Sequence, residues 1–232
     1  MEIKIWSDVR CPFCYIGKKK FEKALEKFPQ KDKVNITWKS FQLDPNLKTD
    51  AAGSTLDYFV KAKGVSADQA RQMFSGATKM ARETGLEFNL EESVPANSFM
   101  AHRLIQLANS KGLGNEIEEA LFKAHFTEAK NIDDVEVLIE TAGSIGMDAE
   151  EVRTTLESDA FAYEVKQDEL EARNIGVRGV PFFVFNDKYA VSGAQSSEAF
   201  LEVLEKAWQE FQPKPDLEIS EGESCTTDGQ CN

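Results

Sequence analysis

The chain has 232 residues, of which 41% are hydrophobic and 29% are charged, and its formal net charge is −13. This composition is typical of a globular protein, and the acidic balance argues against nucleic acid or anionic lipid as partners, because both require clustered Lys and Arg. No run of about 18 apolar residues is present, so the sequence predicts no membrane span.

Residues 2–6 are predicted to form a strand, and apolar residues at helical spacing predict a helix over residues 15–28. Between them lie Cys11 and Cys14, separated by Pro12 and Phe13. A helix start presents free N–H groups and the positive end of the helix dipole, which favour a thiolate at Cys11. Cys14 is close enough to attack a mixed disulfide formed at Cys11, and we expect Pro12 and Phe13 to influence thiolate stability and substrate contact.

The remaining elements follow from periodicity. A second strand is predicted over residues 34–39, and residues 54–174 have an almost wholly helical pattern that Gly85 and Pro95 interrupt. Two short strands, residues 181–185 and 189–192, then flank a tight turn. A terminal helix follows, with Ser196 or Ser197 as its cap and Phe211 as the last residue of its apolar face. The sequence therefore predicts an α/β fold with a large all-helical insertion.

Residues 213–232 are predicted to form a flexible acidic tail, because they lack the apolar residues needed for a core. This tail carries Cys225 and Cys231, and the Asp-Gly pair between them is a turn signal that can bring the two sulfurs together. Two interpretations stay open. The pair is either a second redox couple that exchanges electrons with the first pair or with substrate, or it has no catalytic part.

The order of elements resembles the thioredoxin fold with an inserted helical domain, as in the DsbA family. Four segments are similar to the FrnE-like branch of that family: residues 6–15, 41–45, 97–104 and 176–183. The resemblance implies a thioredoxin-like domain made of residues 1–50 and 175–212, with residues 51–174 as the helical insertion. It also implies a thiol–disulfide oxidoreductase or isomerase that uses its own redox-active disulfide and no separate cofactor. In such an enzyme Cys11 attacks the substrate disulfide and Cys14 resolves the mixed disulfide.

In that family a cis proline faces the two cysteines, and the resemblance places it at Pro181. Such a proline has no N–H, and the backbone of Val180 before it can then bind an extended substrate. The alternative is an ordinary proline at the first position of a strand, where the missing donor is harmless. We expect Val180 and Pro181 to contact substrate.

Three polar side chains are candidate modulators of the cysteines. Arg10 could further stabilise a thiolate at Cys11, and Asp8 could relay a proton to or from Cys14. Their ordinary alternatives are a solvated arginine and a turn-forming aspartate. His102 and His125 both lie in predicted helices, and a lone helical His is usually a packing residue. His102 is the better candidate for a catalytic role because it lies in a family-like segment.

Other functions remain as alternatives. A glutathione-dependent small-molecule isomerase resembling 2-hydroxychromene-2-carboxylate isomerase has the same architecture, although those relatives commonly have Ser at the first cysteine. A redox-sensing or zinc-binding module is a further alternative, with Cys225 and Cys231 or the histidines completing the ligands.

The sequence predicts thiol- or disulfide-containing proteins as partners, with glutathione as a candidate electron donor or ligand, and no metal. No secretory signal pattern is visible before Cys11, so we expect the cytoplasm, where a close cysteine pair is more often catalytic than structural. The sequence gives no indication of the oligomeric state.

Overall fold

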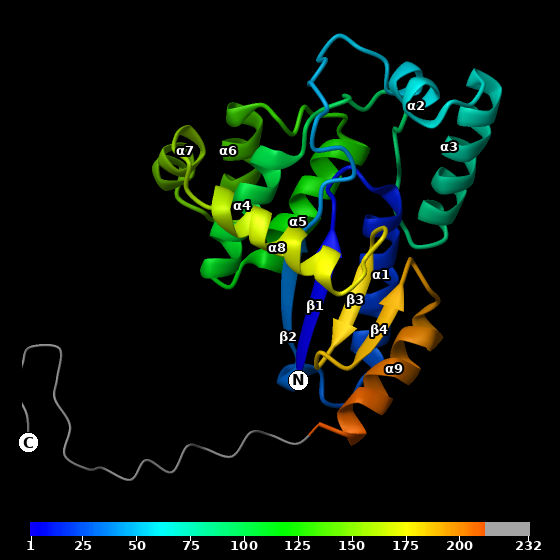
Figure 1. Cartoon of the computed structure of the whole chain (residues 1–232), viewed down its shortest axis with the longest axis vertical. Coiled ribbons are helices and arrows are strands. Elements are labelled where there is room, and N and C mark those ends of the chain that lie inside the picture. Colours follow the sequence, from blue (N-terminus) through cyan, green and yellow to red (C-terminus); the bar gives the residue numbers. More distant parts are fainter. Residues whose placement is uncertain (212–232) are drawn as a thin grey trace, which may run out of the picture.

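The computed structural model describes residues 1–211, and Figure 1 shows the arrangement of their helices and strands. The N-terminal part contains β1 (Glu2–Ser7), α1 (Pro12–Lys27), a short 3-10 turn (Lys31–Lys33) and β2 (Asn35–Ser40). The helical block contains α2 (Thr55–Lys63), α3 (Ala67–Arg82), α4 (Phe99–Ser110), α5 (Gly114–Phe122), a π-helical turn (Lys123–Thr127), α6 (Val135–Gly143), α7 (Ala149–Glu157) and α8 (Ala162–Asn174). The C-terminal part contains β3 (Phe182–Phe185), β4 (Tyr189–Ser192) and α9 (Ser197–Gln209).

The four strands form one mixed sheet in the order β2-β1-β3-β4. β1 pairs parallel with β2 and antiparallel with β3, so Ile5 lies opposite Trp38 on one side and Phe183 on the other. Alternate residues of β1 enter different cores, as the pleat of a strand requires. Ile5 packs with α1, whereas Trp6 packs with Ala172 of α8 on the opposite face. The sheet is therefore covered by helices on both faces.

A buried carboxylate fastens the helical block to this sheet. Asp168 of α8 accepts hydrogen bonds from the Ser40 backbone N–H at 2.9 Å and from Gln106 Nε2 at 2.6 Å, and it pairs with Lys39 Nζ at 2.7 Å. Ser40 ends β2, Gln106 lies on α4, and the three contacts satisfy both carboxylate oxygens. The position of α4 relative to the ends of β1 and β2 is thus fixed.

Most of the predicted elements are confirmed, with differences at helix ends. α1 begins at Pro12 and not at residue 15, because proline at the first helical position needs no N–H and already has a helical φ. Ser196 caps α9, but the helix ends at Gln209, so Phe211 lies beyond it. The pattern break at Gly85 and Pro95 is confirmed as the non-helical connection between α3 and α4.

The division into domains stays a prediction, and the predicted tail lies outside the described residues. No helix within residues 1–211 is both long and apolar enough to cross a membrane.

Candidate active site

The two central cysteines lie where β1 leads into α1. Cys11 is the N-cap residue with extended backbone angles, Pro12 follows at the first helical position, and Cys14 lies in the first turn. The Cys11 N–H donates to the Asp8 carbonyl at 2.8 Å, and the Cys14 N–H donates to the Cys11 carbonyl at 2.9 Å. Both cysteines are free thiols, Cys11 being 4% exposed and Cys14 fully buried. Only Cys11 is therefore placed to meet a partner from outside.

The loop before β3 brings the second predicted element against the first. The Val180–Pro181 peptide bond is cis, as the resemblance implies. The Cys11 thiol donates to the Val180 carbonyl at 3.5 Å, so residues far apart in the sequence meet at one point. Gly17 on α1 makes this approach possible, because a Cβ there would lie 3.0 Å from Pro181 Cγ.

A buried carboxyl group lies behind Cys14, and the sequence did not indicate it. Ser7 Oγ donates to Glu118 Oε1 at 2.6 Å, and both residues are buried. Burial raises the pKa of Glu118 to about 7, although Ser7, His102 and Lys18 oppose this. Burial and the neighbouring Cys11 also raise the pKa of the Cys14 thiol, while the Ser7 hydroxyl favours its thiolate. Ser7 therefore connects a buried thiol to a buried acid.

Asp8 is fully buried, and its carboxylate holds the chain around Cys11. Its Oδ2 accepts from the Leu43 N–H at 2.7 Å and its Oδ1 from the Arg10 N–H at 3.1 Å. His102 Nε2 lies 3.6 Å from Oδ1, an ion-pair distance that is too long for a hydrogen bond. The structure thus places the Asp8 carboxylate against Leu43, Arg10 and His102.

The Asp8–His102 pair shifts both pKa values. Burial alone would raise the pKa of Asp8, but His102, Arg10 and the Leu43 N–H outweigh it and lower this pKa. Burial alone would lower the pKa of His102, but Asp8 raises it. His125 differs, since burial and the charge of Arg10 lower its pKa to about 4. Of the two histidines, His102 is the one that faces a carboxylate at ion-pair distance.

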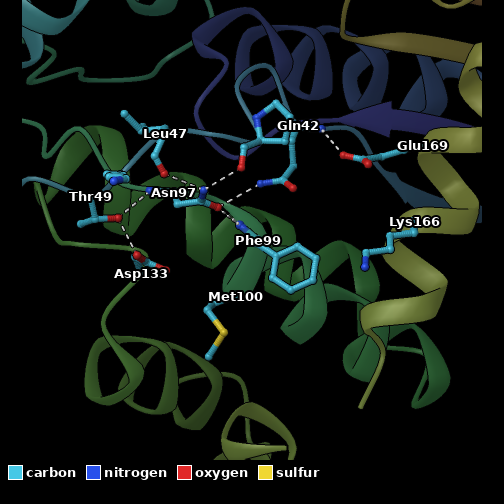
Figure 2. A pocket seen from close by; sticks show the side chains of 11 residues that line it. Gln42, Leu47, Thr49, Asn97, Phe99, Met100, Asp133, Lys166 and Glu169 are labelled. Carbon is cyan, nitrogen blue, oxygen red and sulfur yellow. Dashed lines mark hydrogen bonds between the residues drawn. The ribbon is translucent and has the colours of Figure 1, made fainter. Parts of the chain in front are cut away.

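Asn97 connects the start of α4 to the loop after β2, and it lines a cavity of about 490 Å³ shown in Figure 2. Its Oδ1 accepts from Gln42 Nε2 at 3.0 Å and from the Phe99 N–H at 2.8 Å, and its Nδ2 donates to the Leu47 carbonyl at 2.8 Å. The same loop carries Leu43, which binds Asp8. The family-like segment around Asn97 therefore supports the cysteine site from the helical block.

Two large apolar side chains of the site are exposed. Phe13 is 42% exposed and Leu43 is 50% exposed, although large apolar side chains are usually buried. Within residues 1–211, no group of three His, Cys, Asp or Glu side chains is arranged to hold a metal ion. Cys225 and Cys231 lie outside the described residues, so both interpretations of that pair remain predictions.

A family model described as a DSBA-like thioredoxin domain matches residues 2–205. The chain belongs to this family. A probable DsbA oxidoreductase from Streptomyces coelicolor is 38% identical, with a TM-score of 0.85, over 100% of this chain and 98% of that chain. YwbO from Bacillus subtilis (strain 168), described as an uncharacterized protein, is 28% identical over 217 residues, which are 92% of this chain and 98% of YwbO.

Two further solved structures share the fold at low sequence identity. Cytosolic disulfide reductase DsbM from Pseudomonas aeruginosa with GSH is 15% identical with a TM-score of 0.64, over 90% of this chain and 100% of that chain. A 2-hydroxychromene-2-carboxylate isomerase is 17% identical with a TM-score of 0.62, over 90% of this chain and 95% of that chain. The predicted DsbA family and thioredoxin-like fold are confirmed, and the FrnE-like branch stays a prediction.

Proposed function

We propose that this DsbA-like protein is a thiol–disulfide oxidoreductase in which Cys11 exchanges with disulfides of proteins or small molecules. The observation that carries the proposal is the contact between the Cys11 thiol and the Val180 carbonyl at 3.5 Å, beside the cis peptide bond. The helix start favours negative charge on the Cys11 sulfur, and a thiolate is the nucleophile in disulfide exchange. The free backbone next to Pro181 can align the chain that is attacked.

The reaction balances within the substrate and the two cysteines. The Cys11 thiolate attacks one sulfur of a substrate disulfide, a mixed disulfide forms, and the other substrate sulfur leaves as a thiolate. The Cys14 thiolate then attacks the Cys11 sulfur, and the second substrate thiolate leaves. The substrate is reduced, and Cys11 and Cys14 are oxidised to a disulfide. The reverse sequence oxidises a dithiol substrate.

Cys14 needs a proton acceptor before it can attack, because it is fully buried and its pKa is raised. We assign this role to Glu118 acting through Ser7, which donates to it at 2.6 Å. The Cys14 proton passes to Ser7 Oγ while the Ser7 proton passes to Glu118. A carboxyl group with a pKa of about 7 is suited to accept and return a proton near neutral pH.

Trapping of the mixed disulfide tests the proposal. The Cys14→Ser variant should accumulate a covalent complex with a disulfide substrate, because the resolving thiol is gone. The Cys11→Ser variant is the matched control and should form no complex. Failure of Cys14→Ser to form any disulfide-linked complex, together with no reaction of the wild type, would overturn the proposal.

A glutathione-dependent isomerase is the competing function, and the shared fold with 2-hydroxychromene-2-carboxylate isomerase supports testing it. The presence of both thiols favours disulfide exchange. The isomerase would gain support from tight glutathione binding by a Cys14→Ser variant that retains catalysis of a small-molecule isomerisation. Disulfide exchange requires the second cysteine for turnover.

We further propose the cytoplasm as the compartment of action. The fold shared with a cytosolic disulfide reductase supports this. Fractionation of the native organism, with the full chain detected in the soluble cytoplasmic fraction, tests it.

A further inference from the structure

Arg10, the residue before Cys11, is held by a closed ring of contacts that joins three segments of the chain. Its N–H donates to Asp8 Oδ1 at 3.1 Å, and Asp8 Oδ2 accepts from the Leu43 N–H at 2.7 Å. The next residue, Asp44, accepts from the Tyr58 hydroxyl on α2 at 2.9 Å. The Tyr58 ring returns to Arg10, whose guanidinium carbon lies 5.0 Å from the ring centroid. This stacking is a cation–π contact that holds the guanidinium against Tyr58 of α2.

Within the described part of the chain, the Arg10 guanidinium has no carboxylate partner. Arg71, Arg82 and Arg153 form ion pairs at 3.2, 3.5 and 2.6 Å. Arg10 forms none, and its buried Nη1 has no hydrogen-bond partner among residues 1–211. The side chain as a whole is half-buried, so it is partly accessible to solvent. An ordered guanidinium with unused donors is suited to bind a carboxylate.

Two carboxylates, Asp8 and Asp44, belong to the contacts around Arg10, and each has another partner. The Asp8 carboxylate is buried 3.6 Å from His102 Nε2, and Asp8 raises the pKa of this histidine. His125 has a pKa of about 4 and is neutral at neutral pH. The second carboxylate, that of Asp44, accepts a hydrogen bond from the Tyr58 hydroxyl. Asp8 and Asp44 are thus engaged by His102 and Tyr58, and within residues 1–211 neither forms an ion pair with the Arg10 guanidinium.

We propose that Arg10 is a carboxylate-binding subsite, and that the favoured substrates of Cys11 are disulfides with a carboxylate close to the sulfur–sulfur bond. The inference rests on the proposed disulfide exchange and names its substrate class. The carboxylate lies on Arg10 while Cys11 attacks the nearer sulfur, and the other sulfur leaves as a thiolate. The exposed Phe13 and Leu43 provide apolar contact for the rest of the substrate.

A simpler role for Arg10 would be to stabilise the Cys11 thiolate. Loss of thiolate stabilisation would change the exchange rate with every disulfide by the same factor, because it affects only the enzyme. A carboxylate subsite changes only the reaction with anionic disulfides. The ratio of the exchange rate with an anionic disulfide to the rate with a neutral disulfide therefore separates the two roles.

The experiment compares dithiodiglycolate with its uncharged diamide, a pair that differs in the carboxylate alone. Reduced full-length protein is mixed with each disulfide, and the reaction is quenched with an alkylating agent and quantified by mass spectrometry. The wild type should prefer the dianion after correction for the rates of both probes with a free reference thiol. Arg10→Gln should lower the dianion rate by about tenfold to a hundredfold, the range expected for hydrogen bonds to a charged group.

The diamide rate of Arg10→Gln should change much less, so the preference ratio should fall. Tyr58→Leu removes the stacking ring and should lower the ratio in part, whereas Arg153→Gln on α7 removes an equal charge elsewhere and should not. An unchanged ratio in Arg10→Gln would overturn the subsite. Reaction of the wild type with neither probe, nor with any protein disulfide, would instead overturn the proposed function.

Discussion

Replacing Glu118 by Gln should change how the stability of the protein depends on pH. The Glu118 side chain is 1% exposed, and Ser7 Oγ donates to its Oε1. Burial raises its pKa to about 7, so the folded state resists ionisation of this group. A glutamine keeps the acceptor oxygen for Ser7 and removes only the titration.

The size of the effect follows from linkage between protonation and folding. The pKa of Glu118 is about 7 in the folded chain and about 4.3 in an unfolded one. This pKa difference corresponds to a free energy of roughly 3 to 4 kcal/mol. Because the folded pKa is the higher one, the contribution of Glu118 to stability is complete below about pH 4.3 and is lost as pH rises through about 7. Glutamine suffers no such loss. Relative to the wild type, the free energy of unfolding of Glu118→Gln should therefore rise by roughly 3 kcal/mol between about pH 4.5 and about pH 8.

Urea unfolding of the reduced proteins at closely spaced pH values measures this difference, with circular dichroism and tryptophan fluorescence as two probes. Glu116→Gln is the matched control, because Glu116 is an exposed residue of the same helix. Its difference from the wild type should stay small and constant. A flat difference for Glu118→Gln over the same range would refute the assignment of a strongly raised pKa to this carboxyl group.

Three further substitutions test other parts of the structure. Arg103 donates to four main-chain carbonyls around the end of α7. Arg103→Met should therefore lower the free energy of unfolding, measured in urea, by about 3 kcal/mol or more. A decrease below about 1 kcal/mol would contradict this. Gly17→Ala places a Cβ 3.0 Å from Pro181, and it should slow disulfide exchange roughly tenfold with little change in melting temperature. A wild-type exchange rate would show that the loop adjusts freely. His102 has a raised pKa from its pairing with Asp8, so this pairing stabilises the fold below about pH 6.5 and its contribution fades as pH rises through the folded pKa. His102→Gln should accordingly lose more stability near about pH 6 than near about pH 9, and equal losses would argue against the pair.

The sequence was sufficient to predict what local pattern encodes. The CxxC at a strand–helix junction, the helical block and the β3–β4 hairpin all follow from periodicity and turn residues, and the structure confirms them. The start of α1 was predicted three residues late because a helical pattern of side chains becomes visible only after its first turn. Proline at position 12 was the signal for the earlier start.

Glu118 could not have been found in this way. It lies at the edge of the apolar stripe of α5, where a glutamate normally reaches solvent, and no local feature distinguishes it from the exposed Glu116. Its role depends on Ser7, which lies at the end of β1 and reaches it only in the folded chain. His102 and Asp8 were each predicted as modulators of the cysteines, but their pairing with each other depends on where Asp168 fixes α4 and has no local signal.

The pairing of β1 with β3 has a consequence for the nascent chain. β1 and the two cysteines leave the ribosome before β3 and the Val180–Pro181 segment are made. Until then the edge of β1 that later binds β3 is open, and Cys11 lacks the carbonyl that faces it in the finished protein. The thiols are thus most accessible to unwanted oxidation while synthesis is under way. A chain released before β3 would carry the reactive pair without the segment that aligns its substrates.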